Sequence, residues 1–538
     1  MTAEPAPAET TPADERIPLH TKVAAGAGEG AINIGVNIPP NFSFLVYNLG
    51  LAVSPTLLGV ALFIPRIWDA VIDPVMGSVS DNSTSKWGRR KPFMLIGALL
   101  SIAGIFAICY VPGGIDNQSW SNTEWGPVLN FGFATLDLNV PLRDWAYAGI
   151  LTFVCIIFYT CLTVFAVPYG ALTMELTSDY EERTRVMSFR TLFTYLTGFF
   201  LAWLYPIVKA SEDTRTGAIV VGSILAVLLA VIMFAPTFFV PERTKRREAG
   251  GGLEDVRKQP KVGIWKSIVT TIKQPILLMI VAAYTIGFLG VIMVLKLGLY
   301  VAIFHVYGGG EQGETDGAYM QGWAQTFAII MGLITVLIIN RLATKVEKKW
   351  LLIGALMSSF IGGLLSWWLY SPDFGTFKQI IPLFGDFGNE SWYFWLPDRI
   401  NFWFHPLAIS FALIWPGLAG LLIMSNSMIA DVCDLDELKT GQRREGSYWA
   451  VFNWIQKMAI GVALLFSGAI LDLVGYVSEA GVKTQTLDVI NNMRWAYMLV
   501  VCGGVGLAAV IVLFIPLNKQ RMENVRVELE AKRAANDV

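Results

Sequence analysis

The chain has 538 residues, of which 54% are hydrophobic and only 15% are charged, and its formal net charge is −2. Soluble domains carry about a quarter charged residues, so this composition excludes an isolated soluble domain, a disordered chain and a disulfide-stapled secreted protein. The small net charge gives no basic field, which argues against a nucleic-acid partner. The five cysteines form no CxxC pair and the three histidines are scattered, so we expect no metal and no other cofactor. We therefore predict a polytopic membrane protein, with the lipid bilayer as its surroundings.

Twelve apolar stretches of about 20 residues, the length that crosses a bilayer core, follow the first 25 residues. Backbone polar groups cannot stay unpaired in lipid, so each stretch is predicted to be a helix and the fold class to be an all-α membrane protein. The predicted spans are 26–52, 56–79, 92–111, 145–174, 188–208, 217–240, 275–304, 318–340, 350–370, 403–430, 448–474 and 495–516.

The basic residues of the loops predict the orientation of these helices. If both termini lie on one side, 30 Lys and Arg residues fall in the loops and tails of that side, counting Arg190 at the start of the span 188–208, and 7 fall on the other. Because basic loops stay in the cytoplasm, we predict a multi-pass protein of the plasma (inner) membrane with both termini cytoplasmic. Residues 1–25 show no signal-peptide pattern and are predicted to be a disordered cytosolic tail, and 517–538 a second cytosolic tail.

A charged cytosolic stretch, 241–274, divides the twelve spans six and six and contains three consecutive glycines. We interpret it as a linker between two halves, 26–240 and 275–516. Two six-helix halves around a central cavity form the major facilitator architecture, which this division predicts.

The two halves also echo each other after their fourth helices. The pattern Asp-x-x-Glu followed by arginines occurs in both, and it begins at Asp179 in the first half and at Asp434 in the second. Two matches at corresponding places favour a duplicated six-helix unit.

The second predicted helix carries two acids within the membrane, Asp69 and Asp73. Their spacing of four puts them on one helix face, and Arg66 lies one turn from Asp69 on that face. A carboxylate at mid-bilayer costs about 3 kcal/mol or more and indicates function, and two adjacent carboxylates repel unless a proton or another cation lies between them. We therefore predict a coupling-ion site here. The alternative is an inert Arg66–Asp69 pair, with Asp73 facing a loop.

Two lysines also lie inside predicted helices, Lys457 in the eleventh and Lys296 in the seventh. A lysine within the membrane must pair with another group or face water. Lys457 is flanked by Asn453 and Gln456, which predicts the polar wall of a cavity; alternatively, it pairs with the acids of the second helix and holds the halves together. For Lys296, a cavity position and snorkelling to the outer interface remain equally open.

Charged residues at the cytosolic helix ends form a further group. We predict that they dock on neighbouring helix ends, closing the cytosolic side in one state and releasing it in the other; the alternative is that the basic loops only fix the topology. The predicted gating and charge-network residues are Arg66, Asp81, Arg89, Arg90, Asp179, Arg183, Asp431, Asp434, Glu437 and Arg443.

Several of these segments resemble the signature of the glycoside–pentoside–hexuronide:cation symporters, the family of the melibiose carriers. The resemblance spans residues 26–516. It rests on Arg66-Ile67-Trp68-Asp69 through Asp73-Pro74, on Asp81 with Trp87-Gly88-Arg89-Arg90-Lys91-Pro92, on Val167-Pro168-Tyr169 followed by Asp179 and Arg183, and on Asp431-x-x-Asp434-x-x-Glu437-x-Lys439 followed by Arg443, Glu445 and Lys457.

The resemblance implies a cation site formed by Asp69, Asp73 and the hydroxyl of Thr163. The sequence departs from the sodium-coupled melibiose carriers at Ile72, where those proteins place an Asn beside the second acid. Loss of that oxygen favours a proton over sodium as the coupling ion.

The sugar site is changed more strongly. The family's fourth-helix acid and nearby Trp fall at Ala166 and Gly170, and its tenth-helix Trp falls near Leu422. Galactoside recognition as in the melibiose carriers is therefore not expected. Of the family's site the resemblance retains Lys457, and it places Arg190 within one residue of the family's fifth-helix Arg. Residues that would complete a differently shaped substrate site, with ordinary helix packing as the alternative, are Asn33, Tyr169, Trp415 and Asn453.

Together these observations predict a secondary active transporter that acts as a monomer. It moves a small molecule, a sugar, glycoside or related solute, inward with a proton or a sodium ion. Two alternatives stay open: an amphipathic or lipid-like solute carried on the same fold, and a non-transporting sensor on a transporter scaffold. No nucleophile–base pair or metal cluster falls at membrane depth, so we expect no enzyme activity.

Overall fold

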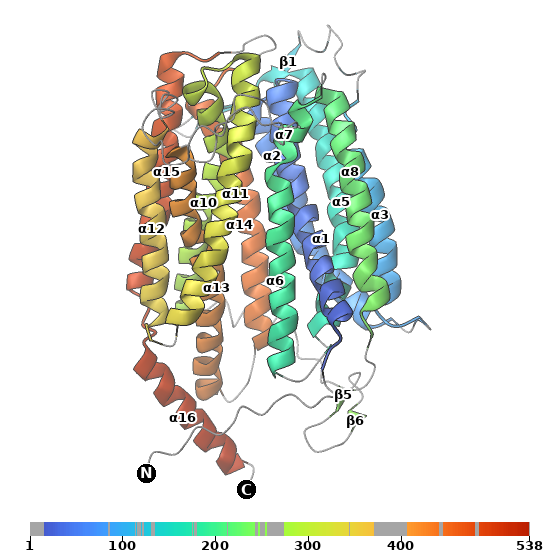
Figure 1. The fold of residues 1–538 in the computed structure, drawn as a ribbon, viewed down its shortest axis with the longest axis vertical. Coiled ribbons are helices and arrows are strands. Elements are labelled where there is room, and N and C mark those ends of the chain that lie inside the picture. The colour runs from blue at the N-terminus through green and yellow to red at the C-terminus, as the bar shows by residue number, and fades with distance from the viewer. Residues whose placement is uncertain are drawn as a thin grey trace, which may run out of the picture.

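Long apolar segments of this chain form helices that run side by side along one direction (Figure 1). The computed structural model describes residues 16–370 and 406–536, apart from gaps at 84, 86, 113–114, 116–119, 121–122, 131–134, 175, 177–179, 212–213, 243–245, 248–252, 255–273, 344, 441–444 and 479–483. Within this part, eleven helices are long and apolar enough to cross a membrane.

The N-terminal half of the bundle contains seven helical segments and one π-helical segment. They are α1 (Leu19–Ser43), the π-helical η2 (Phe44–Gly50), α2 (Pro55–Asp81), α3 (Lys91–Cys109), α5 (Leu142–Met174), α6 (Tyr180–Ala202), α7 (Leu204–Lys209) and α8 (Thr214–Phe239). Two short antiparallel pairs connect α3 to α5: β1 (Glu124–Trp125) with β4 (Val140–Pro141), and β2 (Val128–Asn130) with β3 (Thr135–Asp137).

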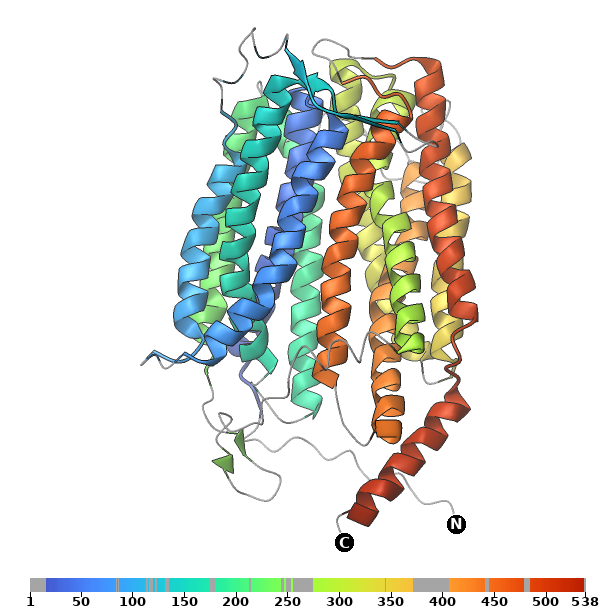
Figure 2. The same cartoon turned by 180° about the vertical axis from the view of Figure 1, so that it is seen from behind.

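The C-terminal half follows a short hairpin of β5 (Arg246–Arg247) and β6 (Leu253–Glu254). Its elements are α10 (Pro275–Val301), the π-helical η5 (Ala302–Val306), α11 (Gly310–Leu342), α12 (Lys348–Leu369), α13 (Pro406–Thr440), α14 (Glu445–Leu473) and α15 (Leu487–Leu513). A last helix, α16 (Lys519–Asn536), points away from the bundle at the end where α1 begins (Figures 1 and 2). We call this end the α16 end and the opposite one the far end.

Eleven of the twelve predicted spans correspond to helices that meet the length and hydropathy requirement for a membrane span. The remaining span, 26–52, corresponds to α1 and η2. Helix α1 packs against α6 and α8 inside the bundle, and glycines, prolines and polar side chains lower its hydropathy.

The structure moves the boundary of the first predicted tail and adds a helix to the second. The first helix begins at Leu19, inside the predicted 1–25 tail, because the backbone N–H of Ile17 and the Lys22 ammonium both bind the Glu182 carboxylate. The predicted 517–538 tail contains α16, whose Met522, Val525 and Leu529 lie on one buried face that packs near α13. Most of the predicted linker, 241–274, lies outside the described residues.

The two halves meet mainly through α2 and α14, which lie next to each other in Figure 2. At the far end further contacts join the halves. The Trp203 ring packs edge-on against Trp323 with centroids 5.1 Å apart, and its Nε1 donates to Thr326 Oγ1 at 3.3 Å. Lys209 pairs with Glu314 there. Together these contacts close the far end of the bundle.

Close backbone approach between α2 and α14 depends on glycine. A methyl group at Gly468 would come within 2.1 Å of the Pro55 carbonyl oxygen, and one at Gly59 within 2.9 Å of the carbonyl oxygens of Leu464 and Leu465. Small residues at such crossings allow helices to pack within van der Waals contact of their backbones. Any side chain at these positions must push the helices apart.

Gly468→Ala is therefore expected to open the far end. Overpacking of this kind costs about 1–3 kcal/mol. This is enough to raise the fraction of molecules in which α2 and α14 are separated at the far end. Spin labels placed on α2 and α14 at the far end should report longer distances by pulsed electron resonance. Gly354→Ala is the matched control, since nothing lies within 4 Å of its added methyl group. Unchanged distances in Gly468→Ala would contradict this account of the closure.

Candidate functional site

The acids of α2 lie at the junction of the two halves. Thr163 Oγ1, from α5, lies 2.9 Å from Asp69 Oδ1 and 3.1 Å from Asp73 Oδ1. A hydroxyl has one proton to donate, so Thr163 either shares it between the two carboxylates in a three-centre bond or donates to one of them and accepts from the other once that carboxyl group is protonated. The geometry thus suits a carboxyl pair that takes up one proton.

Lys457 of α14 reaches across from the other half. Its Nζ lies 3.0 Å from Asp69 Oδ2 and also contacts Asp73 Oδ2. Of the alternatives for these residues, the geometry matches a Lys457 that pairs with both acids. It does not match an inert Arg66–Asp69 pair with Asp73 facing a loop.

Exposure changes along this face of α2. The Arg66 side chain is 1% exposed and that of Asp69 6%, whereas Asp73 is 30% and its partner Lys457 28% exposed. Because α2 runs from the far end toward the α16 end, the exposure of these side chains increases toward the α16 end. The exposed Asn453 lies one turn from Lys457 in that direction on α14.

Arg66 is held by groups from three helices. Its Nη1 is 3.9 Å from Asp69 Oδ2, its guanidinium lies 4.2 Å from the centre of the Tyr159 ring, and its Nη2 donates to the Val36 carbonyl. Pro40, four residues after Val36 in α1, has no N–H to bind that carbonyl. Arg66 fills the vacant position and ties α1 to α2.

A polar stripe follows one face of α1. Asn33, Asn37 and Asn41 are spaced by four residues, and each later amide donates to the backbone carbonyl of the one before, at 2.8 and 2.9 Å. Asn33 Nδ2 itself donates to Thr197 Oγ1 at 3.0 Å. The predicted substrate residue Asn33 thus belongs to a longer row of amides.

The stripe begins with a residue that sequence reasoning missed. Glu29, one turn before Asn33, accepts hydrogen bonds from Arg190 Nε at 2.9 Å and Nη2 at 2.5 Å. Arg190, predicted to bind substrate, is therefore already neutralised by a carboxylate. The four-residue spacing from Glu29 to Asn33 was the available signal, since it puts an acid on the same face.

Two other predicted substrate residues differ in their surroundings. Tyr169 is completely buried, stacks on Phe165 and donates to the Ala25 carbonyl. It packs α5 against α1 in this arrangement, and its role in binding the substrate stays a prediction. Trp415 of α13 is partly buried and lies against Gly332 of α11.

The predicted gating residues fall into local clusters. The Glu242 carboxylate accepts the backbone N–H groups of Arg89 at 2.9 Å and Arg90 at 3.2 Å, within the N-terminal half. Asp431 accepts Lys348 Nζ at 2.7 Å, within the C-terminal half. Asp434 and Glu437 lie at the α16 end of α13. Asp179, Arg443 and the side chains of Asp81 and Arg183 lie outside the described residues.

Glu182 anchors the start of α1 to α6. Burial opposes ionisation of this fully buried carboxyl, but hydrogen bonds from Lys22, from the Ile17 N–H and from Arg185 outweigh it and lower its pKa. The acid is therefore held as a carboxylate that fixes the N-terminal segment at the α16 end.

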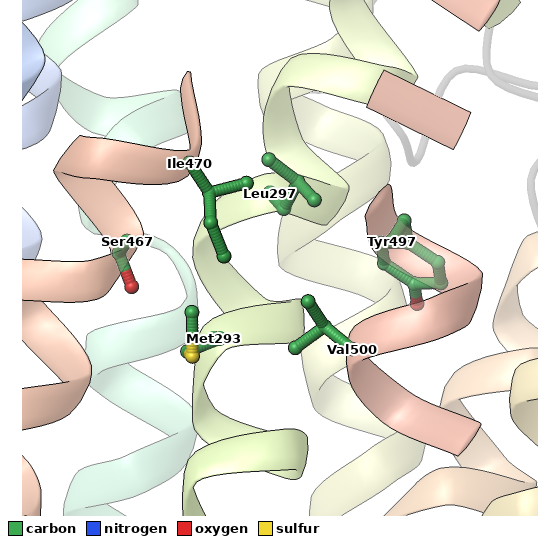
Figure 3. Close-up of a pocket in the computed structure, with 6 residues that line it drawn as sticks. All are labelled: Met293, Leu297, Ser467, Ile470, Tyr497 and Val500. Carbon is green, nitrogen blue, oxygen red and sulfur yellow. The ribbon is translucent and has the colours of Figure 1, made fainter. Parts of the chain in front are cut away.

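A separate pocket lies inside the C-terminal half between α10, α14 and α15 (Figure 3). It is lined by Met293, Leu297, Ile470, Val500, Ser467 and Tyr497. No charged side chain lines it, and it does not reach the ion pair of Asp73 and Lys457. It is packing space rather than a candidate site.

Comparisons with known proteins agree with this architecture. A family model described as MFS/sugar transport protein matches residues 24–519. The glucuronide carrier protein homolog of Escherichia coli (strain K12) is 23% identical over 523 residues, covering 97% of each chain. The sodium-dependent lysophosphatidylcholine symporter 1 of Mus musculus is 30% identical over 151 residues, 28% of this chain and 24% of that protein. The crystal structure of a nucleoside transporter shares the fold, with a TM-score of 0.51 at 10% identity over 93% of this chain and all of the other.

Proposed function

This chain belongs to the MFS/sugar transport protein family, and we propose that it is a symporter that imports a glycoside or related sugar together with a cation. The observation that carries the proposal is the ion pair of Asp69 and Asp73 with Lys457, which joins the two halves. A cation that reversibly neutralises one of these carboxylates would weaken the ion pair. It would therefore change how strongly the two halves hold together.

The coupling ion acts on this pair. A proton on the Asp73 carboxyl removes one of the two charges that hold Lys457, and Thr163 Oγ1 is placed to accept a hydrogen bond from it. With the pair weakened, the halves are free to rock around the site. The amides of α1 and the Arg190–Glu29 pair then offer donors and acceptors to the sugar hydroxyls.

The orientation follows from the loops. Lys and Arg residues favour the side of the termini by 30 to 7, so the α16 end is assigned to the cytoplasm. The contacts at the far end and the exposure of Asp73 and Lys457 then correspond to an inward-facing state.

Uptake into proteoliposomes tests this function. A panel of labelled glycosides is offered with an imposed pH gradient, a sodium gradient or neither. One pH unit supplies about 1.4 kcal/mol per proton, so accumulation of at least one glycoside should reach about tenfold when the outside is more acidic. Equal levels inside and outside with every gradient and every sugar would overturn the proposal.

A second candidate solute has one specific observation in its favour. The lysophosphatidylcholine symporter matches this chain at a higher identity than the glucuronide carrier protein homolog does, although the match covers 28% of this chain. Adding a labelled lysophospholipid to the same panel decides between the two, since cation-driven uptake of the lipid alone would replace the sugar.

A further inference from the structure

The first helices of the two halves end in the same way. Helix α1 continues into the π-helical η2, and α10 continues into the π-helical η5, so each half carries a π-helical segment at the far end of its first helix. Segments of this kind are rare and frequently lie at functional sites. Because α1 and α10 belong to different halves, the contacts between their far ends must change whenever the halves separate there.

Asn48 of η2 is the centre of a buried hydrogen-bond network between the halves, and it is 1% exposed. The hydroxyl of Tyr300, from α10, donates to Asn48 Oδ1 at 2.5 Å. Asn48 Nδ2 donates to the Val53 carbonyl at 2.6 Å and to Ser478 Oγ at 3.1 Å. Ser478 Oγ in turn donates to the Val53 carbonyl at 3.2 Å. Both amide N–H groups and the amide oxygen are thus occupied, and Tyr300 and Ser478 belong to the C-terminal half.

A second polar contact between α1 and α10 lies one turn closer to the α16 end. Lys296, four residues before Tyr300 on the same face of α10, donates from Nζ to Asn41 Oδ1 at 2.5 Å and to the Pro40 carbonyl at 3.2 Å. It therefore also crosses from the C-terminal half to the N-terminal half. Polar contacts suit a reversible closure, because water replaces each hydrogen bond when the halves separate and the net contribution of each bond is small.

The chain turns directly after η2, at a strained residue. Ala52 has a φ of 57°, and it is the only non-glycine residue with a positive φ in the part of the chain that the structure describes. This left-handed conformation is unfavourable for a residue with a Cβ atom and persists only where its surroundings enforce it. The Ala52 N–H donates to the Asn48 carbonyl at 2.9 Å, and the next residue, Val53, accepts the two side-chain donors described above. Strain of this kind is typical of segments that switch between two arrangements.

We propose that Asn48 is the latch of the far end and that the turn at Ala52 is its hinge. In the closed arrangement, the bonds to Tyr300 and Ser478 hold η2 in place and keep Ala52 left-handed. When the halves separate, water takes over these bonds, the turn relaxes to a negative φ, and a path opens between α1 and α10. The strain of Ala52 therefore favours opening, and the Asn48 network opposes it.

The test uses variants with opposite expected signs. Tyr300→Phe keeps the ring and leaves Asn48 Oδ1 without its donor, so it should shift the population about tenfold toward molecules that are open at the far end. Ser478→Ala breaks the same network from the segment after α14 and should shift the population in the same direction. Ala52→Gly removes the strain, because glycine adopts a positive φ freely. Added to Tyr300→Phe, it should return the population about fivefold toward the closed arrangement.

The populations are measured by pulsed electron resonance in the absence of any solute. Spin labels are attached at Tyr110→Cys, directly after α3, and at Leu487→Cys, at the start of α15, two exposed positions at the far ends of different halves. Tyr370→Phe is the matched control, since it removes a buried hydroxyl that bonds to the Tyr497 hydroxyl at 3.1 Å within the C-terminal half. It should leave the distances unchanged.

Two results would overturn the proposal. If Tyr300→Phe and Ser478→Ala gave the same distances as the Tyr370→Phe control, the Asn48 network would not hold the far end closed. If Ala52→Gly left the population of Tyr300→Phe unchanged, or moved it further toward the open arrangement, the turn would not be the hinge. Neither result bears on the identity of the solute, which the uptake panel tests separately.

Discussion

Asp73→Asn is expected to abolish uphill accumulation of the solute. The amide cannot take up a proton at neutral pH, so the gradient no longer acts on the contact with Lys457. Asp69 still holds Lys457 at 3.0 Å, which keeps the halves joined in this region. Where the unmodified protein accumulates about tenfold per pH unit, the variant should only equilibrate its solute across the membrane.

The structure indicates how to separate this effect from misfolding. Asp73 is the more exposed of the two acids, and its loss leaves the contacts of Asp69 with Thr163 and Lys457 in place. Removing a charge from the membrane interior also removes a desolvation cost, so membrane insertion and thermal stability should be retained. Exchange of labelled for unlabelled solute with no gradient reports whether binding and rocking survive.

A matched control is Asp488→Asn, which changes the same side chain at an exposed position at the start of α15. It should accumulate solute like the unmodified protein. Normal accumulation by Asp73→Asn would remove Asp73 from the coupling site. If Asp69→Asn also accumulated solute normally, the carboxyl pair would not be the coupling site.

The carboxyl pair was predictable because its geometry is local. Residues four apart share a helix face whatever else the fold does, so Asp69 and Asp73 had to be neighbours once α2 was a helix. Lys457 was also predictable as a partner, since few charges lie within the spans and each must be compensated. The major facilitator architecture followed from the number and grouping of the apolar segments.

Contacts between distant helices were not predictable in the same way. The pair of Glu29 and Arg190 joins α1 to α6, and nothing in either local pattern specifies the rotation of the two helices that brings them together. The surroundings of Tyr169 were not predictable either. An aromatic residue on a membrane helix can face lipid, a cavity or a neighbouring helix, and the sequence pattern is the same in all three cases. Helix α16 did carry a signal, the spacing of Met522, Val525 and Leu529, but its docking near α13 is a tertiary contact.

Ile72→Asn is expected to give the protein a dependence on sodium that the unmodified protein lacks. The oxygens that the structure gathers between α2 and α5 are those of Asp69, Asp73 and Thr163, and the Lys457 ammonium occupies the space beside them. Metal ions in oxygen sites gather about six ligands, whereas a proton needs a single carboxyl oxygen. Unmodified uptake should therefore respond to a pH gradient and not to sodium at constant pH.

An Asn at position 72 adds an amide oxygen next to Asp73 in the chain and one turn from Asp69, the place where the sodium-coupled melibiose carriers have it. One added ligand worth about 1.4 kcal/mol corresponds to a tenfold gain in sodium affinity, which should appear as saturable stimulation of uptake by sodium at fixed pH. Ile72→Leu, which changes shape without adding an oxygen, should stay insensitive. If the unmodified protein already shows saturable sodium stimulation, Ile72 does not decide the ion, and a water molecule or a backbone carbonyl freed near Pro74 must complete the sodium shell.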